Sequence, residues 1–505
     1  MRTVSLPLCL LALTSAAAGQ SLVRVVGAGD AGFGGTRSQP YAIGVDDQGR
    51  VSHWDRVEDA AGDTTYTLSF DGRLLVATGL PVSSGATVSF LRPDLARPFG
   101  EQVVSFSALF SGGCSLLLNT KVIPGGCGSH IAANSNGQVA LRGTDIRVLT
   151  LDASGNVLDQ RSFPTTSKAS LAAGSSAFGP FEQMLELNEA GDVLYEVLDT
   201  TEELYVNGQV LVQRGGASPL AGATWSRFNG GSINVHGEAA FDALLQNGVD
   251  VVATKDRIVA ASGASIPAIG SASFFSFRYF GGAEDGPEIN DEGDVLYYAL
   301  YEEDDVFVGQ GLFLEDEQVL SVGETPFVGT GAPMGGIYGF EMSPNGRFVV
   351  INSQDVSTST WVNTSGLVDL GRVASIPGCS TSPAKLSRME GFAVAGGTVV
   401  LGMDGAQANG ALGYVLISDA PVVGYPPCGL LLPFGELVVD VAGINPLVTV
   451  TTQPWQGGAV PAVVSILNDQ RLVDHVFYAQ GVFVAPGSSE PVRLTNALEI
   501  EVGAP

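Results

Sequence analysis

The chain has 505 residues, of which 52 are acidic and only 24 are basic, and its formal net charge is −28. Such an acidic surface repels nucleic acids and anionic membranes, so we expect no nucleic-acid partner. Glycine is abundant, at 66 residues, and no segment shows the periodicity of an amphipathic helix. The composition favours an all-β protein that is long enough to hold more than one domain.

The first twenty residues predict an export signal. Arg2 supplies a short positive segment, Leu6–Leu13 form an apolar core, and Ala16–Ala18 supply the small residues of a cleavage site. The apolar core is shorter than the about 20 residues that span a bilayer. We therefore expect a signal peptide over residues 1–20, a mature chain secreted to the periplasm or the exterior, and no membrane span.

Four cysteines lie beyond this signal: Cys114, Cys127, Cys379 and Cys428. An even number in an exported chain favours disulfides, and three pairings are open. Proximity along the chain favours Cys114–Cys127, inside the second repeat unit, and Cys379–Cys428, which would tie the repeats to the C-terminal module. A zinc site is disfavoured because the chain has no CxxC pair with a neighbouring histidine.

One short pattern organises the chain. It consists of an apolar residue, then Asn, Asp or Ser, two further residues, a glycine, a polar residue and an alternating strand. The glycines of the clear copies are Gly49, Gly137, Gly191, Gly237, Gly293 and Gly346, and weaker copies lie at Gly100 and Gly397. We expect each copy to be a tight hairpin turn, called here the anchor turn, in which the Asn or Asp side chain caps the turn and the glycine takes a positive φ.

The anchor glycines recur every 37 to 56 residues, a length that suits four-stranded β-propeller blades. A second turn follows within each unit, as in Asp71-Gly72 and Asn207-Gly208. Leu22–Gly34 reads as the end of a unit and Thr398–Val423 as the beginning of one, so we expect the N-terminal strand to close a ring. The ring has eight blades if Gly100 marks a unit and seven if it does not.

From about Cys428 the pattern changes to short strands such as Leu437–Val441 and Val476–Gln480, which predict a small C-terminal β-sandwich. The expected domains are the signal peptide (1–20), a β-propeller (21–425) and the sandwich (426–505). The repeat form Ile289–Tyr297 resembles a class of uncharacterised secreted bacterial propeller-like repeat proteins, and the end of the chain resembles the β-rich module often fused to them. That module usually holds a second internal cysteine, which this chain lacks.

Acidic residues recur in one class of connection. If the strands run up and down, the anchor turns and second turns lie on one side of each unit, the turn face, and all other connections lie on the opposite loop face. The loop-face acids are Glu58, Asp59, Asp63, Asp199, Glu202, Glu203, Asp250, Glu302, Glu303, Asp304, Asp305 and Asp355. The run from Glu302 to Asp305 is a candidate for binding calcium or a basic ligand, although the chain has no DxDxDG loop.

These observations predict a secreted, non-enzymatic protein that binds an extracellular glycan or protein through its acidic loop face. The alternative is a secreted propeller hydrolase or lyase acting on polysaccharide, whose retaining chemistry would need two carboxyl groups about 5 Å apart. The chain has neither HExxH nor GxSxG, so the sequence assigns no catalytic and no cofactor-binding residue.

Overall fold

The structure is a computed structural model. It describes residues 22–27, 30–99, 101–109, 114–123, 130–142, 145–163, 184–198, 202–266, 269, 272–277, 286–304, 306–328, 331, 333–355, 362–376, 378–379, 382–406, 409–441 and 448–505. The expected signal peptide lies outside these residues. Within them we find no α-helix, and no helix long and apolar enough to cross a membrane.

Seven sheets follow one another up to residue 370, all antiparallel except for the short parallel pair of β1 and β27, and we number them in chain order. Sheet 1 contains β2 (Thr36–Val45), β3 (Val51–Glu58), β4 (Thr64–Phe70) and β5 (Arg73–Ala77). Sheet 2 contains β6 (Val88–Phe99), β7 (Gln102–Leu109), β8 (Cys114–Leu118) and β9 (Lys121–Ile123). Sheet 3 contains β10 (His130–Ala133), β11 (Gln138–Arg142), β12 (Ile146–Leu151) and β13 (Val157–Phe163). Sheet 4 contains β14 (Leu185–Leu187), β15 (Val193–Leu198), β16 (Glu202–Val206) and β17 (Gln209–Gln213).

The remaining three sheets of this series follow the same order. Sheet 5 contains β18 (Trp225–Ile233), β19 (Ala239–Leu245), β20 (Asp250–Thr254) and β21 (Ile258–Ala261). Sheet 6 contains β22 (Ser273–Ser276), β23 (Glu288–Ile289), β24 (Val295–Glu303), β25 (Val306–Leu314) and β26 (Glu317–Ser321). Sheet 7 contains β28 (Met334–Met342), β29 (Phe348–Asp355) and β30 (Val362–Asp369), with β1 (Leu22–Gly27) and β27 (Phe327–Val328) at its edge.

Apolar side chains fill the space between successive sheets. The buried cluster around Trp225 and Phe241 lies between sheets 4 and 5, and the cluster around Phe274 and Tyr297 lies between sheets 5 and 6. Similar clusters join every other pair of neighbours, including sheet 7 with sheet 1, where Val350 packs with Ala42 and Val51. Each central strand is therefore covered on both faces, which explains apolar runs such as those of β11 and β24.

The N-terminal strand completes sheet 7. β1 pairs antiparallel with β30, with Val23 opposite Leu367, and Leu22 packs against Gly366 and Phe327. The sequence predicted that this strand would instead complete a unit beginning at Thr398. That expectation is wrong, because β33 (Thr398–Asp404) pairs with the C-terminal strand β38 (Val460–Ser465) and not with β1.

The C-terminal strands form three further sheets. The five-stranded sheet contains β31 (Arg372–Ile376), β34 (Leu412–Ser418), β37 (Val448–Thr451), β39 (Val476–Val484) and β40 (Val492–Glu501). The three-stranded sheet contains β32 (Lys385–Glu390), β33 and β38, and the hairpin contains β35 (Leu430–Leu432) and β36 (Gly435–Leu437). A 3-10 turn, η2 (Gln470–Leu472), precedes β39.

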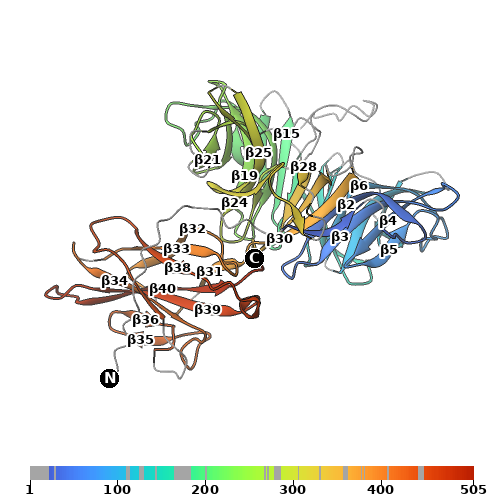
Figure 1. Cartoon of the computed structure of the whole chain (residues 1–505). Helices are drawn as coiled ribbons and strands as arrows, with labels where there is room; N and C mark the ends of the chain where they lie inside the picture. Colours follow the sequence, from blue (N-terminus) through green and yellow to red (C-terminus); the bar gives the residue numbers. More distant parts are fainter. Residues whose placement is uncertain are drawn as a thin grey trace.

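One buried core lies between the two larger C-terminal sheets. Leu401 and Met403 of β33 face Val415 of β34 and Phe483 of β39 within it. Figure 1 shows these strands as a separate body beside sheets 1–7. Because β31 already pairs with β40, the change of strand partners falls near residue 371, earlier than the boundary near 425 that the change of sequence pattern predicted. A local sequence pattern cannot predict pairing between strands that are more than 60 residues apart.

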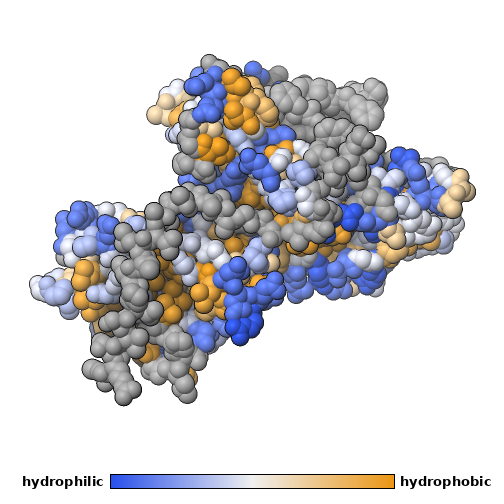
Figure 2. Space-filling view, viewed as in Figure 1, coloured by the Kyte–Doolittle hydropathy of each residue, from blue (hydrophilic) through white to orange (hydrophobic). Residues whose placement is uncertain are grey.

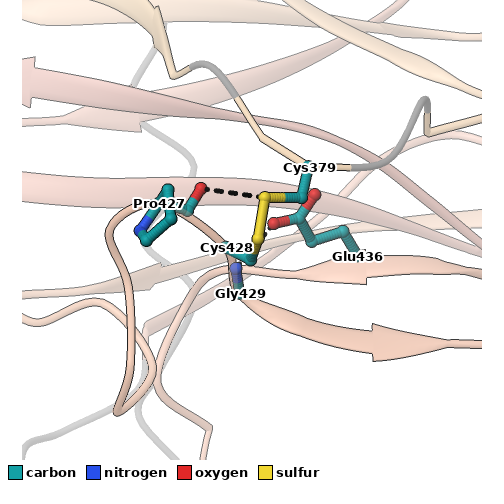
Figure 3. Close-up of a disulfide and its surroundings, with 5 residues drawn as sticks. All are labelled: Cys379, Pro427, Cys428, Gly429 and Glu436. Atoms are coloured by element: carbon teal, nitrogen blue, oxygen red, sulfur yellow. Dashed lines mark hydrogen bonds between the residues drawn. A yellow bond between two sulfur atoms is a disulfide. The ribbon is translucent and has the colours of Figure 1, made fainter.

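The disulfide Cys379–Cys428 is present, with a Cα–Cα distance of 5.1 Å (Figure 3). It joins the segment after β31 to the segment before β35, so it lies within the C-terminal strands and does not tie them to the repeats. Next to it, the backbone N–H of Gly429 donates to the buried carboxylate of Glu436 at 2.6 Å. The second predicted disulfide cannot be placed, because Cys127 lies outside the described residues and only the backbone of Cys114 is described.

The pairing of β1 generates a stability prediction. Leu22 is fully buried in the core shared by sheets 6 and 7, so Leu22→Ala should lower the free energy of unfolding by about 3 kcal/mol through lost contacts and a cavity. Urea denaturation of the full chain measures the change. Val23→Ala, at an exposed position of the same strand, is the matched control and should cost less than about 0.5 kcal/mol. Equal losses in the two variants would contradict a packed role for β1.

Candidate functional site

The anchor turns have the predicted local structure. The six glycines of the clear copies have φ between 72° and 88°, a region that favours glycine. In the turn of sheet 6, Asn290 Oδ1 accepts the backbone N–H groups of Glu292 at 3.0 Å and Asp294 at 2.8 Å. The predicted second turns are confirmed as well, with positive φ at Asp71, Gly72, Asn207 and Gly208.

The same asparagines also join one anchor turn to the next. Asn134 Nδ2 donates to the carbonyl of Asn188 at 2.8 Å, and Asn188 Nδ2 donates to the carbonyl of Asn234 at 2.5 Å. Asn234 Nδ2 in turn donates to the carbonyl of Asn290 at 3.0 Å. Each side chain thus caps its own turn with its oxygen and binds the next sheet with its nitrogen, a second role that the turn pattern in the sequence did not predict.

Between the last and first sheets a different donor makes this connection. The asparagine position is Ser343 in sheet 7 and Asp46 in sheet 1, and neither offers an amide N–H. Asn345 supplies the donor, because its backbone N–H donates to Asp47 Oδ1 at 2.9 Å and its Nδ2 lies 3.4 Å from the carbonyl of Asp47. Hydrogen bonds between turns therefore extend from sheet 7 to sheet 1.

Acidic residues in the anchor turns are also used between turns. Asp291 Oδ1 accepts the backbone N–H of Val235 at 3.1 Å, and Glu189 accepts both the backbone N–H and the hydroxyl of Ser135. Burial raises the pKa of Asp47 and of Asp291; the negative charge of Asp46 raises the pKa of Asp47 further, and the negative charge of Asp47 raises the pKa of Asp291 further. These carboxylates are structural acceptors on the turn face.

A second set of side chains, on the second strands β3, β11 and β29, forms hydrogen bonds to the next sheet. Trp54 Nε1 donates to the carbonyl of Leu91, and Arg142 Nη2 donates to the carbonyl of Glu196 at 2.9 Å. Asn352 both accepts from the backbone N–H of Ala42 at 2.7 Å and donates to its carbonyl at 2.8 Å. The sequence did not predict these contacts, although a polar residue within an apolar strand is a local sign of them.

Glu196 is the most perturbed carboxyl of this region. Its side chain is buried, and burial together with the negative charge of Glu202 raises its pKa to about 8, against the opposing effect of Arg142. A perturbed pKa often marks a catalytic group. Here the guanidinium of Arg142 binds the backbone of Glu196, and the residue lies within the packing of adjacent sheets, so its environment explains the pKa without catalysis.

Three arginines join the C-terminal strands to the turn face of sheets 6 and 7. Arg388 contacts Asp294 and Glu317 of sheet 6, each at 3.2 Å, and Arg372 lies 3.7 Å from Glu292. The third is a nearly buried guanidinium. Arg347 binds Asp369 of its own sheet at 2.9 Å, and at 2.5 Å both Asp474, in the turn before β39, and Glu501 of β40. The turn face of these two sheets is thus in contact with the C-terminal body.

The loop-face acids are distributed over several sheets. Glu202 Oε1 accepts the backbone N–H of Phe228 at 2.5 Å, Asp59 caps its own turn, and Glu58 pairs with Arg56 at 3.0 Å. Glu302, Glu303 and Asp304 end the β24–β25 hairpin, and Asp305 lies outside the described residues. In the part of the chain that the structure describes, no three His, Cys, Asp or Glu side chains are placed to hold a metal ion.

No protein-family model matches the chain, and no curated protein matches it in sequence. Similar solved structures are β-propeller-type proteins. A Bacteroides caccae protein of unknown function is 13% identical, with 52% of this chain and 84% of that chain covered and a TM-score of 0.24. The PQQ-bound aldose sugar dehydrogenase of Streptomyces coelicolor is 11% identical, with 70% and 98% covered and a TM-score of 0.27. A Trypanosoma rangeli sialidase complex with 2,3-difluorosialic acid is 10% identical, with 95% and 91% covered and a TM-score of 0.25. Such values carry no conclusion about activity, and the fold rests on the strand pairing.

The bonds between anchor turns generate a prediction. Asn188→Asp keeps the oxygen that caps the turn but replaces the amide donor with an oxygen that faces the carbonyl of Asn234. Since Asn188 is buried, the change should cost about 2 kcal/mol of unfolding free energy, measured with urea at pH 7. Asn247→Asp, in an exposed turn where only the oxygen is used, should change it by less than about 0.5 kcal/mol. A cost for Asn188→Asp no larger than this control would contradict the role of its nitrogen.

The pKa of Glu196 generates a pH dependence. Between about pH 4.5 and pH 8 the folded chain keeps a proton on Glu196 that the unfolded chain releases, so this group makes the free energy of unfolding fall as pH rises. Glu196→Gln removes that loss. We expect the variant to melt at the parental temperature at pH 5 and above it at pH 8. Asp316→Asn, an exposed control, should differ from the parent equally at both pH values, and the same result for Glu196→Gln would contradict the assignment.

Proposed function

We propose that this chain is a secreted, non-enzymatic interaction protein that binds an extracellular glycan or protein through the loop face of a seven-bladed β-propeller. The C-terminal strands, residues 372–505, form a β-sandwich attached to the opposite side. The disulfide Cys379–Cys428 supports an oxidising compartment, since such bonds form and persist outside the cytosol.

Pairing across the chain supports closure of the ring. β1 extends sheet 7, and Val350 of sheet 7 packs with Ala42 and Val51 of sheet 1. Asn345 joins the anchor turns of the same two sheets. Seven sheets result because the strands on either side of residue 100 form their own sheet, whereas the pattern at Gly397 belongs to the C-terminal strands.

The turn face is occupied by structural contacts, and this supports ligand binding on the loop face. Anchor-turn amides and carboxylates are engaged with neighbouring turns, and Arg388 and Arg347 join sheets 6 and 7 to the C-terminal strands. A ligand on that side would have to compete with these contacts. Connections on a rigid scaffold commonly bind ligands, and the loop face carries acids in successive sheets.

An array of extracellular glycans and cationic peptides tests this function. We expect the full chain to bind, and binding to weaken about tenfold in a loop-face variant, Asp63→Asn with Glu203→Gln and Asp304→Asn, because each change removes a negative charge that attracts the ligand. The matched turn-face variant, Asp71→Asn with Asp256→Asn and Asp316→Asn, removes the same number of charges and should bind as the parent does. Equal weakening in both variants would contradict the loop-face assignment, and release of reducing sugar ends from the array would support a polysaccharide hydrolase instead.

A further inference from the structure

An exposed apolar surface lies at the loop-face end of sheet 6. β25 begins with three consecutive apolar residues, Val306, Phe307 and Val308, whose exposed fractions are 62%, 58% and 48%. Phe275 of β22 is 48% exposed, although its neighbours Phe274 and Phe277 are buried. Figure 2 shows apolar surface at the upper end of the molecule, over the strands that Figure 1 labels β21 and β25. Core packing explains the buried aromatics but not these side chains.

The backbone of this segment lies at an edge of the sheet. β26 pairs with β25 only from Gly311, opposite Ser321, and the last bond on that side runs from the backbone N–H of Val322 to the carbonyl of Gln310. On its inner side β25 pairs with β24 as far as Val306, opposite Glu303. Among the described residues, no strand pairs with the outer edge of Val306–Gly309. An unpaired strand edge is a template for an added strand.

The negative charge around this edge indicates that the partner is basic. Between residues 279 and 346 the sequence has 15 acidic residues and no Lys, Arg or His. The turn-face acids of sheet 6 form ion pairs with Arg257, Arg372 and Arg388. These ion pairs lie at the end of the sheet 6 strands opposite to Val306–Gly309. At the loop-face end, Glu302 is opposite Phe307 in the pairing, and Asp304 is exposed in the turn. Exposed apolar side chains beside acids complement a segment that is both apolar and basic.

We propose that the outer edge of Val306–Gly309 binds an extended segment of a partner protein in which basic and apolar residues alternate. The segment adds to sheet 6 as a strand, so that alternate side chains reach the two faces of the sheet, where Phe307 lies beside Glu302 and Val306 beside Glu303. This inference rests on the proposed function, because it places the partner on the loop face, and it narrows the ligand to a cationic protein segment.

Fluorescence anisotropy with a labelled synthetic peptide of alternating lysine and valine tests the inference on the full chain. We expect the parent to bind it, and to bind an alternating glutamate–valine peptide at least about tenfold more weakly. Val306→Ser with Phe307→Ser should weaken binding of the lysine–valine peptide about tenfold or more, because both apolar contacts are lost. Both positions are exposed, and an unchanged melting temperature confirms that the variant folds.

The matched control places the same change on another outer strand. Val157→Ser with Leu158→Ser alters exposed apolar residues of β13, at the edge of sheet 3, and should leave peptide binding within about twofold of the parent. Equal binding by the parent and the Phe307 variant would show nonspecific attraction to an acidic protein and overturn the proposal. So would concentration-dependent dimers abolished by the Phe307 variant, since the occupant would then be a second copy of this chain.

The two proposals fail in different ways. If the loop-face acid variant loses ligands from the array while the Phe307 variant keeps them and the lysine–valine peptide does not bind, the loop face remains the binding face and the β25 edge is overturned. If the peptide binds only through Val306 and Phe307, and the array glycans bind regardless of the loop-face acids, the edge is supported and the loop-face acids are overturned as the glycan site.

Discussion

Hydrogen bonds from an anchor-turn asparagine to the next anchor turn join sheets 3, 4, 5 and 6 in succession, and this contact sets how these sheets stack. A primary amide both accepts and donates. In Asn188 the oxygen holds the local turn and the nitrogen holds the carbonyl of Asn234, so turn geometry and sheet stacking are fixed together. The side chain is buried, so an unmade bond would leave a polar group without water. An aspartate could close the turn equally well, but it has no amide N–H to donate to the next turn.

Because polar groups of the turn face bind neighbouring turns, the turn face and the loop face differ in how many polar groups are free to bind a ligand. Carboxylates such as Asp291 and Glu189 appear in the sequence as surface charges, yet they accept backbone N–H groups from adjacent turns. The C-terminal strands then contact the same side through Arg388 and Arg347. Binding on the opposite face would leave these contacts intact, which is why the proposed ligand surfaces lie among the loop-face acids and at the exposed end of β25.

Perturbed ionisable groups in this fold follow burial between sheets. His53 is buried in β3, and burial together with the positive charge of Arg37 lowers its pKa to about 3, so it is neutral at physiological pH. Burial raises the pKa of Glu196, because it disfavours the charged form of a carboxyl just as it disfavours the charged form of an imidazole. The two therefore have opposite effects on stability as pH changes: protonation of the unfolded chain at His53 opposes folding below about pH 6.5, whereas Glu196 opposes it as pH rises toward 8.

Local chemistry determined much of this protein from the sequence alone. The anchor glycines, the capping asparagines and the four-strand order of each unit follow from turn geometry, which involves residues close together in the chain. Tertiary packing decided the rest. The pattern at Gly397 is a weaker copy of the anchor turn, yet β33 pairs with β38 and not within a repeat unit. Leu22 likewise lies in the core beside Phe327 and not next to Thr398. Neither choice has a local signal, because strand partners are selected by the apolar surfaces that long-range pairing buries. The exposed edge of β25 also became visible only when β26 was seen to end its pairing at Gly311.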